Sequence, residues 1–179
     1  MRSELAACAL VAGLLVGCAS TSGPPDVERN PRDTARMTRN LEPGVRDKIA
    51  DELRAAEMRF LGGAADEAWD TVTRLYEDTG DPRALEVLGK LSLYEGRFAD
   101  AERHLQAARE LSTNDAAQRD RLDDLIRMTA GFLAYERGAV GEAERHWDAI
   151  RDPAVRDAVD RARGPFDSDA AAVARGGAR

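Results

Sequence analysis

The stretch LEVLGKLSLYEGRFADAERHLQAARELSTND, residues 85–115, carries the clearest structural signal in this 179-residue chain. Apolar residues recur in it at three- and four-residue spacing on both sides of Gly96, as on one face of an α-helix. Gly96 suits the left-handed backbone that ends a helix, and the small Ala101 lets a second helix approach the first closely. The stretch therefore predicts a helical hairpin.

Two further blocks repeat this hairpin: FLGGAADEAWDTV, which starts at Phe60, and YERGAVGEAERHWDAI, which starts at Tyr135. The small alanines equivalent to Ala101 lie 33 residues before it and 42 residues after it. Ala, Leu, Glu and Arg dominate the composition and aromatic residues make up only 5%, which is typical of long helices. We expect an all-α fold built from repeated hairpins. The equivalent turn glycines and alanines are Gly63 and Ala68 in the first block and Gly138 and Ala143 in the third.

Helix starts are marked by aspartates. Asp81 and Asp152 each precede a proline, so each predicts an N-cap followed by proline at the first helical position. The third hairpin's first helix is expected to be long, from about Asp115 to Glu136. A final helix over residues 153–163 is expected to cover the apolar flank of the last hairpin, and both Trp69 and Trp147 are interpreted as core residues.

The middle block resembles the tetratricopeptide repeat. It carries Leu88-Gly89, Gly96, Phe98, Ala101, Leu105 and Ala108 at that family's spacing, although Thr113 stands where the repeat usually closes with proline. The other two blocks match it at Ala56, Gly63, Ala65, Ala68, Val72 and Leu75, and at Gly131, Gly138, Val140, Ala143, Trp147 and Ile150. The resemblance implies a short right-handed solenoid of about three hairpins with a C-terminal capping helix, over residues 45–163.

The N-terminal residues predict a targeting signal. Twelve residues from Leu5 to Val16 form an apolar run that is too short to cross a bilayer, so residues 1–17 are interpreted as a signal peptide. Leu15-Val16-Gly17-Cys18 resembles the lipobox of bacterial lipoproteins, which implies that Cys18 is lipidated. The alternative is an ordinary secretory signal followed by a stray cysteine. Residues 18–44 are interpreted as lipidated Cys and linker, and residues 164–179 as a loose tail.

The lipoprotein resemblance also implies a location. Ala19 and Ser20 follow Cys18, and no aspartate stands there to favour inner-membrane retention in Gram-negative bacteria. The resemblance therefore favours the periplasmic face of the outer membrane. The net charge of −7 argues against a nucleic-acid partner.

Chemical signatures are missing from the sequence: it has no H-E-x-x-H, no phosphate-binding loop and no G-x-S-x-G, so neither a metal, a cofactor nor catalysis is expected. His104 and His146 occupy equivalent places, with Glu102 and Glu144 nearby, and are candidate zinc ligands. Duplication of the hairpin explains the two histidines without a metal, because a zinc site needs three or four converging ligands.

The resemblance places a partner-binding groove on the first helices of the hairpins. It implies an adaptor that binds envelope proteins or peptides and helps to assemble a pilus, secretin or secretion channel. An accessory regulator of a cell-wall synthase or hydrolase is the alternative, and an enzyme ranks last. Dimerisation through an exposed flank stays open, and some groove aromatics are open to a packing role instead. The groove residues implied are Glu57, Phe60, Arg83, Glu86, Lys90, Tyr94, Phe132, Tyr135 and Glu136.

Overall fold

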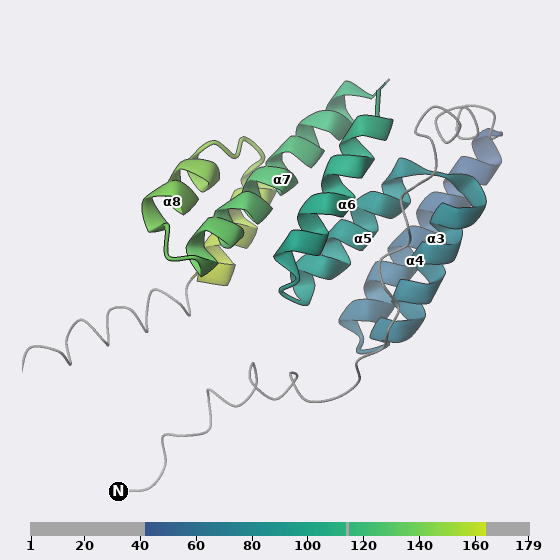
Figure 1. Ribbon diagram of the computed structural model, residues 1–179. Helices are drawn as coiled ribbons and strands as arrows, with labels where there is room; N and C mark the ends of the chain where they lie inside the picture. The colour runs from purple at the N-terminus through teal and green to yellow at the C-terminus, as the bar shows by residue number, and fades with distance from the viewer. Residues whose placement is uncertain (1–41, 114, 164–179) are drawn as a thin grey trace, which may run out of the picture.

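The computed structural model describes residues 42–113 and 115–163. All regular structure in these two ranges is helical, so the expected all-α class is confirmed (Figure 1). The helices follow one another in a row, from α3 and α4 at one side of Figure 1 to α8 at the other. They are α3 (Pro43–Leu61), α4 (Ala65–Thr79), α5 (Pro82–Tyr94), α6 (Phe98–Leu111), α7 (Ala116–Glu136), α8 (Val140–Asp148) and a last helix over 153–163.

Three hairpins, α3–α4, α5–α6 and α7–α8, are closed by the same turn. The turn glycine has a positive φ in each, 92° at Gly63, 71° at Gly96 and 78° at Gly138, so a glycine is required there. One residue later the backbone N–H returns to a carbonyl five positions earlier, at 2.9 Å in all three turns. These bonds satisfy the last carbonyls of the first helix and turn the chain back along it. They are Ala64 to Arg59, Arg97 to Ser92 and Ala139 to Ala134.

Close packing within a hairpin depends on a small residue in its first helix. A Cβ on Gly89 would lie 2.7 Å from Cγ of Leu105 in α6, and a Cβ on Gly131 would lie 2.1 Å from Nε1 of Trp147 in α8. In the first hairpin, the equivalent pair is Ala56 and Val72, both fully buried. The first helix therefore has alanine opposite the smaller valine and glycine opposite the larger leucine and tryptophan.

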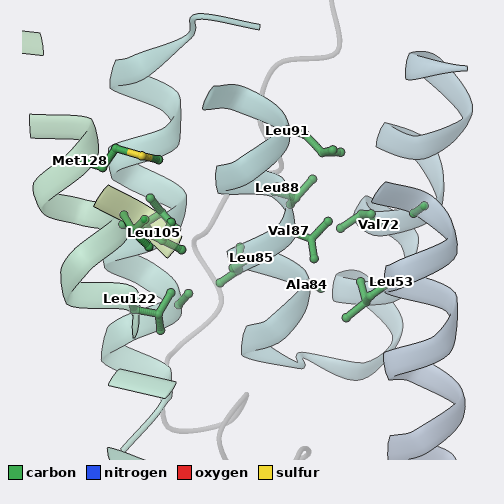
Figure 2. Close-up of a cluster of buried hydrophobic side chains, with 14 of the residues drawn as sticks. Leu53, Val72, Ala84, Leu85, Val87, Leu88, Leu91, Leu105, Leu122 and Met128 are labelled. Carbon is green, nitrogen blue, oxygen red and sulfur yellow. The ribbon is translucent and has the colours of Figure 1, made fainter. Parts of the chain in front are cut away.

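The core runs without interruption along the row of helices. Each helix packs mainly against its neighbours in the chain, and α3 also packs against α5. Leu85, Leu88 and Leu91 of α5 are fully buried, and Figure 2 shows Val72 on one side of this helix and Leu105 on the other. Stability therefore comes from repeated contacts between neighbours rather than from one central cluster.

The predicted helix starts are confirmed, with one shift at the N-terminal boundary. Asp81, Asp115 and Asp152 each accept a hydrogen bond from a backbone N–H two or three residues later. The first helix begins at Pro43, inside the segment interpreted as linker up to residue 44. A proline fits the first helical position because it has no backbone N–H, and an N–H at that position would have no acceptor within the helix.

The last helix closes the C-terminal end of the row, as expected. Its Val155 and Val159 are buried in the common core. The turn before it is fixed by Asp124 of α7, whose carboxylate accepts from the backbone N–H of Arg151 at 3.2 Å and of Asp152 at 2.8 Å. Burial by itself would raise the pKa of Asp124, but these bonds and the Arg127 guanidinium hold that pKa below its usual value.

Candidate interaction surface

Charged side chains link the first helices of all three hairpins. Lys90 of α5 lies 3.0 Å from Glu57 of α3 and 3.7 Å from Glu86 of its own helix. On its other oxygen, Glu86 accepts from Arg121 of α7 at 3.0 Å. Glu86 is almost fully buried, whereas Lys90 and Glu57 are only partly exposed. This series of four alternating charges ties α3, α5 and α7 together, and we call it the charge ladder.

Arg83, a predicted groove residue, is bound to the start of its own helix and remains partly exposed. Its guanidinium pairs with the N-cap carboxylate of Asp81 at 2.7 Å and donates to the carbonyl oxygen of Arg46 at 3.2 Å. The side-chain hydrogen bond to Asp81 is the main reason that the pKa of Arg83 is raised, against the effect of burial. The arginine thus connects α3 to the start of α5.

An aromatic pair lies beyond the ladder, near the turns. Phe60 of α3 stacks on Tyr94 of α5, with ring centroids 5.7 Å apart. Phe60 is partly buried by this contact, whereas Tyr94 remains 56% exposed. Leu61 and Met58, at the same end of α3, are also exposed. Three of the five large exposed apolar side chains of the described residues thus gather at the ends of α3 and α5.

Phe132 corrects the expected groove. It is only 8% exposed, because its ring stacks on Phe98 at 5.1 Å and meets the edge of Trp147 at 5.3 Å. It belongs to the core, which agrees with the alternative that some of these aromatics pack inside the protein. Tyr135 is partly buried 6.0 Å from Trp147, and Glu136 alone of the three α7 residues is fully on the surface.

The two histidines have different surroundings despite their equivalent positions. His104 is buried, with Ser92 Oγ 3.4 Å from its Nδ1 and no partner for its Nε2 among the described residues. Burial, reinforced by Arg103, lowers the pKa of His104 to about 4, so the ring is neutral at pH 7. His146 is partly exposed, 3.8 Å from Glu142. Among residues 42–113 and 115–163, no three ligand-type side chains come close enough to hold a metal ion.

Each tryptophan carries an arginine on its face and a glutamate beside it. Arg97 lies 4.4 Å from the ring centre of Trp69, while Glu95 accepts from Trp69 Nε1 at 3.1 Å and pairs with Arg97 at 2.7 Å. Trp147 is buried, as expected, whereas Trp69 is only partly buried. The second set consists of Arg163, 4.7 Å from the ring centre of Trp147, and Glu144, 2.6 Å from Arg163.

Sequence reasoning missed Arg121 and Gln118, which complete the ladder at Glu86. Both lie in the N-terminal turns of α7, which the shorter α5 lacks. The sequence offered one signal: Glu86 stands between Leu85 and Val87 in a mostly apolar stretch, and an acid buried there needs a cationic or hydrogen-bonding partner.

Comparison of the chain with protein families, with curated proteins and with solved structures finds no match. None of the helices that the structure describes is long and apolar enough to span a bilayer. The predicted signal peptide (1–17), Cys18, nearly all of the predicted linker and the predicted tail (164–179) lie outside the described residues.

Proposed function

We propose that this protein is a lipid-anchored tetratricopeptide-type adaptor that binds other envelope proteins on the face formed by α3, α5 and α7. The observation that carries the proposal is the repetition of one hairpin three times. The three turns have the same hydrogen bond and the same positive-φ glycine, and the hairpins are joined in a row. A row of similar units presents a long surface to a partner without needing a catalytic centre.

The first-helix face supports binding better than it supports chemistry. Most of its charges neutralise one another in the ladder, and Glu86 is buried at its centre. What stays exposed is a group of apolar and aromatic side chains, Met58, Leu61 and Tyr94, beside the ladder. Exposed apolar side chains next to fixed charges are what protein interfaces use as anchors and orienting contacts.

The anchor and the location rest on the N-terminal pattern. Cys18 follows Leu15-Val16-Gly17, and a chain acylated there would stay on the membrane, since two or more acyl chains bind far more firmly than one. We propose the periplasmic face of the outer membrane as the site, and assembly of a pilus, secretin or secretion channel as the process.

Site-specific photo-crosslinking in cells tests the surface. A crosslinking residue is placed at Tyr94 or Glu136 on the first-helix face, and at Gln106, an exposed residue of α6, as the matched control. We expect one envelope protein to be captured from Tyr94 and Glu136 and not from Gln106. Capture from Gln106 with equal yield, or no adduct from either first-helix position, would refute the proposed face.

The intact mass of the membrane-extracted protein, beside its Cys18→Ser variant, tests the anchor. We expect the wild-type chain to begin at Cys18 and to carry acyl mass that the variant lacks. An unmodified wild-type chain that begins before or after Cys18 would refute lipidation, and with it the proposed location.

A further inference from the structure

One exposed residue of each first helix stands at the same place, two residues before the positive-φ glycine of its turn. These are Leu61 in α3, Tyr94 in α5 and Glu136 in α7, before Gly63, Gly96 and Gly138. We call them the edge row. The three turns have the same hydrogen bond, and Figure 1 shows them at the same end of the helices, so the three residues lie along one side of the hairpins.

The edge row has unused binding capacity. Tyr94 uses one side of its ring against Phe60, and its hydroxyl has no hydrogen-bond partner within residues 42–113 and 115–163. Across the same part of the chain, Glu136 has no ion pair, whereas Glu57 and Glu86 of the other first helices and the adjacent Arg137 are paired. Leu61 is 61% exposed, and Met58 beside it 67%.

The molecule itself shows what an aromatic ring and a glutamate hold together. Arg97 lies over Trp69 and pairs with Glu95, and Arg163 lies over Trp147 and pairs with Glu144. In both sets an arginine uses its flat guanidinium against the ring and its N–H groups toward the carboxylate. The edge row has a third ring and a third glutamate, Tyr94 and Glu136, at equivalent positions of successive first helices, and no arginine of the described ranges pairs with that glutamate.

We propose that the edge row docks a cationic segment of another protein, with an apolar side chain of that segment on Leu61 and Met58 and an arginine between Tyr94 and Glu136. This deepens the proposed function and rests on it. The order of the row, apolar, then aromatic, then acidic, gives the bound segment one direction along the hairpins. The aromatic ring contributes cation–π attraction, and the carboxylate contributes a charge-assisted hydrogen bond.

The net negative charge of the helical domain favours a basic segment as the bound partner. Residues 42–163 contain 27 acidic and 19 basic side chains, a net charge of −8. A second copy of the chain would bring the same excess of negative charge to the contact, and an anionic lipid surface or a nucleic acid would be repelled in the same way. A basic segment is attracted over the whole approach and then finds an available carboxylate at Glu136.

Binding of designed peptides to the full chain, kept in detergent solution, tests the proposal. The probes are three fluorescent peptides of about 12 residues: one with leucine and arginine four positions apart, one with citrulline in place of the arginine, and one with serine in place of the leucine. Citrulline keeps the shape and removes the charge. We expect the arginine peptide to bind at least about tenfold more tightly than the citrulline peptide, and also more tightly than the serine peptide.

Protein variants assign the effect to the row. In Glu136→Gln the preference for arginine over citrulline should fall to about twofold or less, and Tyr94→Leu should reduce it while leaving the preference for leucine over serine. Glu110→Gln removes an exposed carboxylate from α6 instead and should leave both preferences as in the wild type. Equal losses in Glu110→Gln and Glu136→Gln would reduce the attraction to net charge alone and overturn the proposal.

The docking chemistry and the adaptor function fail separately. If crosslinks from Tyr94 and Glu136 capture one partner, but the captured segment is acidic and the wild-type chain shows no preference for the arginine peptide, the chemistry proposed here is wrong and the adaptor function stands. If no partner is captured from these positions, the proposed function itself fails.

Discussion

Gly131→Ala should destabilise the protein strongly although alanine favours helices. The added Cβ would lie 2.1 Å from Nε1 and 2.5 Å from Cδ1 of Trp147, where ordinary contact begins near 3.4 Å. The indole would have to move by more than about 1 Å, and it is wedged against Phe132 and Tyr135. Its hydrogen bond to the carbonyl oxygen of Met128, 3.3 Å long, would be lost with that movement.

The opposing effects have known sizes. Overpacking a core costs about 1–3 kcal/mol and a lost buried hydrogen bond about 1 kcal/mol, whereas Gly to Ala in a helix gains up to about 1 kcal/mol. We therefore expect a net loss of about 1–3 kcal/mol in the free energy of unfolding. Gly141→Ala, in α8, has nothing within 4 Å of its new Cβ and should be neutral or stabilising by up to about 1 kcal/mol. Gly89→Ala, which meets Leu105 at 2.7 Å, should fall between the two.

Urea unfolding followed by circular dichroism measures all three variants. A double-mutant cycle with Trp147→Val rebuilds the Ala56 and Val72 pair of the first hairpin in the third, so the cost of Gly131→Ala should largely disappear in that background. If Gly131→Ala is as stable as Gly141→Ala, or costs as much in the Trp147→Val background as in the wild type, the account of how these hairpins pack is wrong.

Three further outcomes follow from the buried polar groups. Because the pKa of His104 is lowered to about 4 from an ordinary value of 6.5, the unfolded chain binds the proton first; stability should fall by about 3 kcal/mol as pH drops from about 6.5 to 4, and His104→Gln should flatten that fall in pH-dependent urea titrations. Asp124→Ala removes the acceptor of two backbone N–H groups and should cost about 3 kcal/mol at pH 7, measured by thermal unfolding. Because the pKa of Asp124 is lowered in the folded chain, its contribution to stability is present above the ordinary pKa of a carboxyl group and should vanish on acidification. A cost that stays the same at low pH would contradict this role of Asp124. Glu86→Ala leaves Lys90 and Arg121 without their shared carboxylate and should cost about 1–3 kcal/mol, whereas Glu110→Ala, on exposed α6 surface, should stay within about 0.5 kcal/mol, and equal values by calorimetry would deny the ladder any structural role.

Much of the fold was available from local signals. The turn glycines, the Asp-Pro helix starts and the spacing of apolar residues each act over a few residues. Together they predict all three hairpins. The boundary error at Pro43 has the same origin, since a proline at a first helical position and a proline in a linker look alike without the packing of Ile49 and Leu53 behind it.

The candidate surface was harder to predict than the fold. Register matching assigns Phe132 to the groove, where its equivalents in the other hairpins, Lys90 and Glu57, are polar and partly exposed. The third hairpin differs because Phe98 and Trp147 enclose the ring from two helices. The equivalence of His104 and His146 fails for the same reason, since one is covered by a neighbouring hairpin and the other is partly exposed.

The helical class, the three hairpins, their turns and the capping helix follow from the amino-acid sequence alone, because each depends on residues close together in the chain. Which side chains of equivalent register are exposed depends instead on how the helices pack. Burial depends on the size of the side chains on the neighbouring helix: Trp147 fills the space beside Gly131, whereas Tyr94 is covered only in part, by Phe60, and Glu136 stays exposed.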